Sequence, residues 1–169
     1  ISILYTAKVA FAQTDLKRLI AYTSVSHMGF VLLGIYAWNA QAVQGAVMTM
    51  LAHGFSAAAL FMLAGGLQHR IHTRDMDKMG GMWGVAPQMA FMAMFFTVAA
   101  VGMPGLGNFV GEFLVILGAL KVNFWLALLA ATGGHWAVLQ TVAWTNMLAN
   151  NLRTDSVATA VTKTFDGKN

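Results

Sequence analysis

The chain is built from long apolar stretches separated by short polar ones, and the longest contains no acidic residue, lysine or arginine between residues 19 and 69. About 20 apolar residues already cross a bilayer, so this stretch predicts two membrane-spanning helices. We expect them over residues 16–37 and 42–67, joined by a tight polar turn at residues 38–41. Small residues recur along the second helix, which favours close packing against neighbouring helices.

The segments that follow predict further full or partial spans. A polar connection over residues 68–86 leads to Pro87, which is well suited to open a helix, and residues 88–103 predict a third complete span. Glycine and proline then mark a turn at residues 104–108. The apolar residues 109–120 are too few to cross alone, so this helix either stops inside or continues towards residue 131.

The two ends of the chain carry weaker patterns. Residues 1–13 are typical of the end of a helix whose start is missing, so we expect the chain to be a fragment of a longer protein. The apolar residues 124–149 are interrupted by Gly133-Gly134-His135, which indicates either a broken helix, as found at transport sites, or a simple turn. Residues 1–150 are expected to form one transmembrane proton-translocating module, and residues 151–169 a polar C-terminal tail.

Composition agrees with this pattern. With 58% apolar and 9% charged residues, the chain lies far from the soluble average of about 25% charged, and the fold class is predicted to be an all-α polytopic integral membrane bundle with about five full or partial spans. The ten basic residues are scattered, which argues against nucleic acid as a partner. Their densest cluster, at residues 70–78, is expected on the cytoplasmic side. The chain has no cysteine, which excludes thiolate-ligated iron–sulfur clusters and cysteine nucleophiles on it.

Two histidines lie within the predicted spans. His27 and His53 are equally far from a hairpin turn near Ala40, which places both roughly 15–20 Å from it, near the bilayer midplane. Histidine is a natural proton relay. Each ring could instead only pack and donate one hydrogen bond, for which the hydroxyl residues Thr23, Ser24 and Ser26 would supply partners to His27. A haem held by both histidines is a further alternative.

Four charged residues are the other candidates for chemistry. Lys17, at the start of a span, either extends its amine to the membrane interface or is a buried amine that loads and releases a proton. Asp15 is placed to cap that helix, and Arg18 is its possible partner or an interfacial anchor. Glu112 follows the turn at residues 104–108 and is either an exposed helix-start glutamate or a member of a proton path.

Four motifs make the chain resemble a known family. They are AFAQTDLKRLIAYTSVSHMGF (10–30), AHGFSAAALF (52–61), RIHTRDM (70–76) and GMPGLGNFVGEF (102–113). Together they resemble the antiporter-like membrane subunits of respiratory complex I, the NADH:quinone oxidoreductase. The resemblance extends from residue 1 to about residue 120 and is closest to the subunit 4 type (bacterial chain M), because the subunit 5 type has a lysine where this chain has Ala57.

The resemblance implies a helical proton-translocating module driven by quinone reduction elsewhere in the complex. Lys17 and His53 would be its principal proton relay, with Glu112, His27, Arg18 and Asp15 as secondary members. No cofactor or metal is expected on this chain; flavin, iron–sulfur clusters and quinone would belong to partner subunits. The expected partners are other membrane-arm subunits, lipid, protons and water, in an energy-transducing membrane such as the bacterial inner membrane.

The resemblance also has gaps. The helix that carries the family's other central lysine, and the glutamate paired with that lysine, would precede residue 1, and the similarity fades after residue 120. Two alternatives therefore stay open. The chain could belong to a cation/proton antiporter or a membrane-bound hydrogenase, which share this module, or it could be a structural fragment that conducts nothing.

Overall fold

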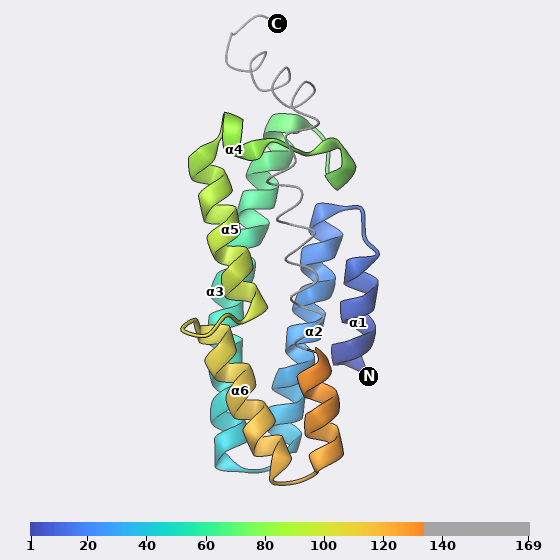
Figure 1. Ribbon diagram of the computed structural model, residues 1–169, viewed down its shortest axis with the longest axis vertical. Helices are drawn as coiled ribbons and strands as arrows, with labels where there is room; N and C mark the ends of the chain where they lie inside the picture. The colour runs from blue at the N-terminus through green and yellow to red at the C-terminus, as the bar shows by residue number, and fades with distance from the viewer. Residues whose placement is uncertain (134–169) are drawn as a thin grey trace, which may run out of the picture.

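Two long antiparallel helices form the axis of the structure, a computed structural model that describes residues 1–133 (Figure 1). They are α2 (Leu16–Tyr36) and α3 (Ala40–Ile71), and both are long and apolar enough to cross a membrane. Asn39 ends the short turn between them and caps α3, because its side chain accepts a hydrogen bond from the Ala42 N–H at 2.9 Å. The predicted hairpin of two spans is confirmed.

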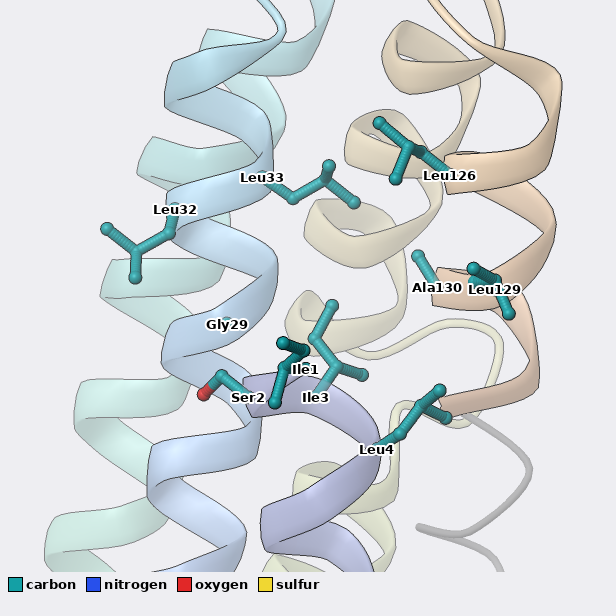
Figure 2. A pocket seen from close by; sticks show the side chains of 10 residues that line it. All are labelled: Ile1, Ser2, Ile3, Leu4, Gly29, Leu32, Leu33, Leu126, Leu129 and Ala130. Atoms are coloured by element: carbon teal, nitrogen blue, oxygen red, sulfur yellow. The ribbon is translucent and has the colours of Figure 1, made fainter.

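Two short helices cover α2. The first is α1 (Ser2–Phe11), and the second is the apolar helix Phe124–Gly133, drawn in orange (Figure 1). A cavity of about 280 Å³ lies where these helices and α2 meet, and Leu33 and Leu126 point towards each other across it (Figure 2). Its lining side chains are apolar apart from Ser2, so no carboxylate, imidazole or lysine side chain of the described residues faces this cavity.

The segment predicted as a third complete span is only half of one. It forms the helix α5 (Pro87–Val101), which has 15 residues. The next helix, α6 (Gly107–Leu120), has 14 residues and continues along the same side of α3 (Figure 1). Each is shorter than the roughly 20 residues that cross a bilayer. The physical reason is the helix break at Gly102, which has the left-handed φ of 78°, followed by Pro104. Of the two alternatives for residues 109–120, the helix that stops is confirmed.

The backbones of α3 and α6 approach each other very closely. A Cβ on Gly111 would lie 2.6 Å from the Thr49 backbone nitrogen, and a Cβ on Gly45 would lie 2.7 Å from the Val115 nitrogen. Real Cβ atoms do not approach so closely. Small residues let membrane helices pack at such short range, and this contact brings the side chains of α6 within reach of α2.

Loops close one end of the bundle. Residues 72–86 contain a 3₁₀ turn, η1 (Met76–Lys78), and a short helix, α4 (Met82–Val85). The Leu16 N–H donates to the Arg74 carbonyl at 3.0 Å, and the Met76 N–H donates to the Thr14 carbonyl at 2.9 Å. The loop before α2 is therefore held against the loop after α3.

The described residues confirm an all-α bundle of full and partial spans. Three predictions lie beyond them: the helix over residues 124–149 past Gly133, its interruption at Gly134-His135, and the C-terminal tail at residues 151–169.

Candidate functional site: a buried histidine–glutamate pair

A histidine of α2 and a glutamate of α6 meet inside the bundle. The Nδ1 of His27 lies 2.6 Å from Oε1 of Glu112, and the two residues are 5% and 8% exposed. They are 85 positions apart in the chain. The contact exists because the close packing of α6 on α3 places Glu112 opposite α2.

The short distance requires a proton between the two atoms. An imidazole nitrogen without hydrogen and a carboxylate oxygen are both acceptors, so one of them must carry a hydrogen to form the bond. Either His27 donates to a carboxylate, or a protonated Glu112 donates to the ring. The pair therefore holds at least one exchangeable proton in the interior of the bundle.

His53 extends this pair onto α3. Its ring centroid lies 4.8 Å from that of His27, with the two rings tilted by 35°. His53 is 6% exposed, and its Nδ1 has no hydrogen-bond partner among the described residues. The prediction that the two histidines lie at matching depth on adjacent helices is confirmed. Rings in such direct contact leave no space for a porphyrin between them, which argues against the haem alternative.

Two residues that the sequence did not single out complete the buried site. Asn108, on α6, donates from Nδ2 to Ser56 Oγ on α3 at 3.1 Å and to the Ala99 carbonyl on α5 at 2.7 Å. Ser56 in turn donates to the His53 carbonyl at 3.2 Å. Their spacing in the sequence could have identified them, because Asn108 lies one helical turn before Glu112 and Ser56 lies three residues after His53, so each shares a helix face with a candidate residue.

The structure decides against two of the alternatives that the sequence left open for this site. The hydroxyls near His27 do not bond to its ring; those of Thr23 and Ser24 donate to the Ile20 carbonyl, and that of Ser26 donates to the Ile3 carbonyl. For Thr23 and Ser24, the carbonyl on the preceding turn of the same helix is the nearest acceptor, and for Ser26 it is a carbonyl of the neighbouring α1. Glu112 is not an exposed helix-start glutamate, because α6 buries it against α2.

The remaining candidates lie together at the start of α2, away from the buried pair. Asp15 caps this helix by accepting from the N–H groups of Lys17 at 2.9 Å and Arg18 at 3.1 Å, as the sequence predicts. Its ion-pair partner is Arg74 of the opposite loop, at 3.6 Å, rather than Arg18. Lys17 is half-buried and Arg18 is exposed. Lys17 and His53 are thus not brought together.

Comparison with known proteins identifies a family and close relatives. Residues 1–136 match the family described as NADH:quinone oxidoreductase/Mrp antiporter, transmembrane. The chain is 59% identical over 122 residues to NADH-quinone oxidoreductase subunit M of Pseudomonas aeruginosa, which covers 72% of this chain and 24% of that protein. It is 53% identical over 143 residues to subunit M of Escherichia coli K12, which covers 85% of this chain and 28% of that protein. The chain therefore spans about a quarter of the length of these relatives.

Two solved structures share the fold. A chain of respiratory complex I from Thermus thermophilus with bound NADH superposes with a TM-score of 0.84 at 33% identity, over 96% of this chain and 37% of that chain. A chain of the Mrp complex from Dietzia sp. superposes with a TM-score of 0.80 at 22% identity, over 87% of this chain and 28% of that chain. The second likeness concerns the fold alone.

Proposed function

Because the chain belongs to the NADH:quinone oxidoreductase/Mrp antiporter transmembrane family, we propose that it is part of a proton-translocating subunit in the membrane arm of NADH:quinone oxidoreductase. Its partners would be the other membrane-arm subunits. We assign no redox group to this chain, so that flavin, iron–sulfur clusters and quinone belong to its partners. The proposed location is an energy-transducing membrane, the inner membrane in a bacterium.

The hydrogen bond between His27 and Glu112 is the observation that supports this function best. It joins two groups that both gain and lose protons, and both are buried between helices. Ionisable groups inside a membrane protein are costly and usually serve transport. In the proposed cycle the pair takes up a proton and releases it through His53, whose ring contacts that of His27.

The energy required is within reach of a local rearrangement. Moving one proton against a membrane potential takes about 2.3 kcal/mol per 100 mV. A hundredfold change in the affinity of the pair for its proton corresponds to about 2.7 kcal/mol. Separating Glu112 from His27, for example by a small shift of α6, would change that affinity because it removes the hydrogen bond that holds the proton between them. Quinone reduction in the partner subunits would drive the shift.

An antiporter that exchanges a cation for protons is the second candidate. The family description includes Mrp antiporters, and a chain of an Mrp complex shares the fold. The identities favour the oxidoreductase, since the subunit M relatives are 53–59% identical to this chain and the Mrp chain is 22% identical. Proton movement that requires sodium and persists without NADH would favour the antiporter.

The test is a substitution of Glu112 in the full-length protein within the assembled complex. We expect Glu112→Gln to slow NADH-driven proton pumping by about tenfold or more, as loss of a positioned proton carrier does, with assembly unchanged. Glutamine has nearly the same shape and can still bond to His27, but it cannot take up a proton. Pumping would be measured with a pH-sensitive dye in membrane vesicles.

Glu112→Asp serves as the matched control, because it keeps an ionisable carboxyl one methylene shorter. We expect it to retain more pumping than Glu112→Gln. Normal pumping by a fully assembled Glu112→Gln variant would remove the pair from the proton path. That result would support the alternative hypothesis that this region is a structural element and conducts no protons.

A further inference from the structure

One side-chain amide bridges the break between α5 and α6. Asn108 lies in the first turn of α6 and is 2% exposed. Its Nδ2 donates to the Ala99 carbonyl, in the last turn of α5, at 2.7 Å and to Ser56 Oγ at 3.1 Å. A single residue thus connects both half-helices to α3.

The Ala99 carbonyl lies where the helix ends, and it accepts a hydrogen bond from Asn108 as well as from a backbone N–H. Gly102 turns the chain away, and its N–H reaches the Ala99 oxygen only at 3.3 Å. The last carbonyls of a helix have no partner within the helix, and burying them unbonded is costly. The shorter bond from Asn108 satisfies this oxygen and holds the two half-helices end to end.

The same side chain lies one helical turn from the buried pair. Asn108 and Glu112 lie one turn apart on the same face of α6, so an anchor at Asn108 fixes the start of the helix that places Glu112 against His27. On α3, the acceptor Ser56 is itself bonded to the His53 carbonyl at 3.2 Å. The bond between Asn108 and Ser56 therefore joins the segments that carry Glu112 and His53.

Two buried side-chain atoms, one on Asn108 and one on His53, have no protein partner among the described residues. They are Oδ1 of Asn108 and Nδ1 of His53, and both are fully buried. Buried polar groups are nearly always hydrogen-bonded, and ordered water supplies the bond where protein does not. A water molecule bound to each of these two atoms would supply the missing hydrogen bond.

We propose that Asn108 is a positioning residue for proton transfer. Its amide nitrogen keeps α5 and α6 joined and holds Glu112 against His27, while its carbonyl oxygen binds water beside His53. This inference rests on the proposed function of the buried pair. Because Asn108 connects the break between α5 and α6 to the helix that carries Glu112, a movement at the break would change the affinity of the His27–Glu112 pair for its proton.

The test uses Asn108→Leu in the full-length protein within the assembled complex. Leucine has a similar size but neither donor nor acceptor, so Glu112 is no longer held in place. We expect proton pumping to slow by about tenfold, because a small misplacement of reacting groups can cost up to about a hundredfold, and its pH profile to shift. Asn108→Gln keeps the amide, and we expect it to restore part of the rate.

Asn39→Leu is the matched control. The Asn39 side chain also links α3 to α6, since its Nδ2 donates to the Gly118 carbonyl at 3.0 Å, but it does so at the far end of α6 from Asn108. We expect an unchanged pH profile for this variant. The same shift in both variants, or a wild-type rate and profile in Asn108→Leu, would overturn the proposal.

A smaller substitution covers the case in which Asn108→Leu does not assemble. Ser56→Ala removes one of the two acceptors of the Asn108 amide and leaves Ala99 in place. A shifted pH profile in this variant supports the proposal, and an unchanged profile overturns it. A failure of the proposed function is recognised separately, because Glu112→Gln would then pump normally.

Discussion

Lys17 differs from the buried pair in both its position and its surroundings. It is half-buried in the first turn of α2, where its N–H bonds to Asp15. It precedes His27 by ten residues, so the two lie roughly 15 Å apart along the helix axis. A proton cannot pass between them in one step, but a lysine amine on a flexible stem is suited to collect protons at the end of a path.

We therefore expect Lys17→Ala to slow proton pumping in the intact complex by about tenfold, as the loss of a proton carrier does, without loss of assembly. The neighbouring Arg18→Ala is the control, because Arg18 is exposed and keeps its charge throughout any cycle. Pumping and NADH oxidation would be measured on the same vesicles. If Lys17→Ala and Arg18→Ala slow proton pumping equally, the loss of a positive charge explains the effect and Lys17 is not a proton carrier.

At the level of single residues, sequence reasoning succeeded where chain geometry alone decides the outcome. His27 and His53 are equally far from a tight turn, and two straight antiparallel helices then bring them to the same depth. Glu112 could be named as a candidate but not paired, because its partner depends on how α6 packs against the hairpin. Asn108 was missed because an asparagine beside proline and glycine is also typical of an ordinary turn.

Among the elements, the contact between α3 and α6 determines whether the site exists. The glycines in this contact allow the backbones to touch, and Gly111 immediately precedes Glu112. Any side chain on Gly111 would meet the Thr49 backbone nitrogen, which cannot rotate away. α6 would have to move away from α3, and Glu112 would move with it.

Gly111→Ala is therefore expected to destabilise the protein by about 1–3 kcal/mol, the usual cost of overpacking a well-packed interior, and to reduce proton pumping. Gly65→Ala on α3 is the matched control, because a Cβ there meets nothing within 4 Å. Thermal unfolding of the purified complex and pumping would be measured for both variants. If Gly111→Ala keeps wild-type stability and pumping, the close approach of the two helices is not needed for the site.

The break between α5 and α6 shows why an element can be misjudged from its sequence. The residues from Pro87 to Met103 are apolar and nearly long enough to span, so hydropathy alone predicts a complete crossing. Pro104 and Gly105 were recognised as part of a turn, while Gly102 was assigned to the span; a turn between two spans and a break within one span have the same composition. In a break within one span, the second half-helix continues along the same neighbouring helix, here α3, whereas after a turn between two spans the chain runs back. This difference depends on tertiary packing and not on local sequence.

At the scale of the whole molecule, the longest described helix has the length of a membrane crossing. α3 has 32 residues and is about 48 Å long at 1.5 Å per residue, slightly more than the roughly 40–45 Å of a bilayer with its headgroups. Large apolar side chains such as Leu51, Phe55 and Met62 are exposed along its middle. Both ends of α3 should therefore reach the headgroup region or the water, on opposite sides of the membrane.

This arrangement makes the predicted orientation testable by chemical labelling, since the chain has no cysteine of its own. Ala40→Cys introduces a thiol at the start of α3, and Lys78→Cys introduces one in the basic loop beyond its end; both positions are exposed. Basic loops are retained on the cytoplasmic side, so in a full-length protein freed of other accessible thiols we expect a membrane-impermeant maleimide to label Ala40→Cys from outside intact cells. Lys78→Cys should react only with inside-out vesicles. Labelling of both variants from one side would contradict a membrane-spanning α3, and the reverse pattern would contradict the orientation assigned to the basic loop.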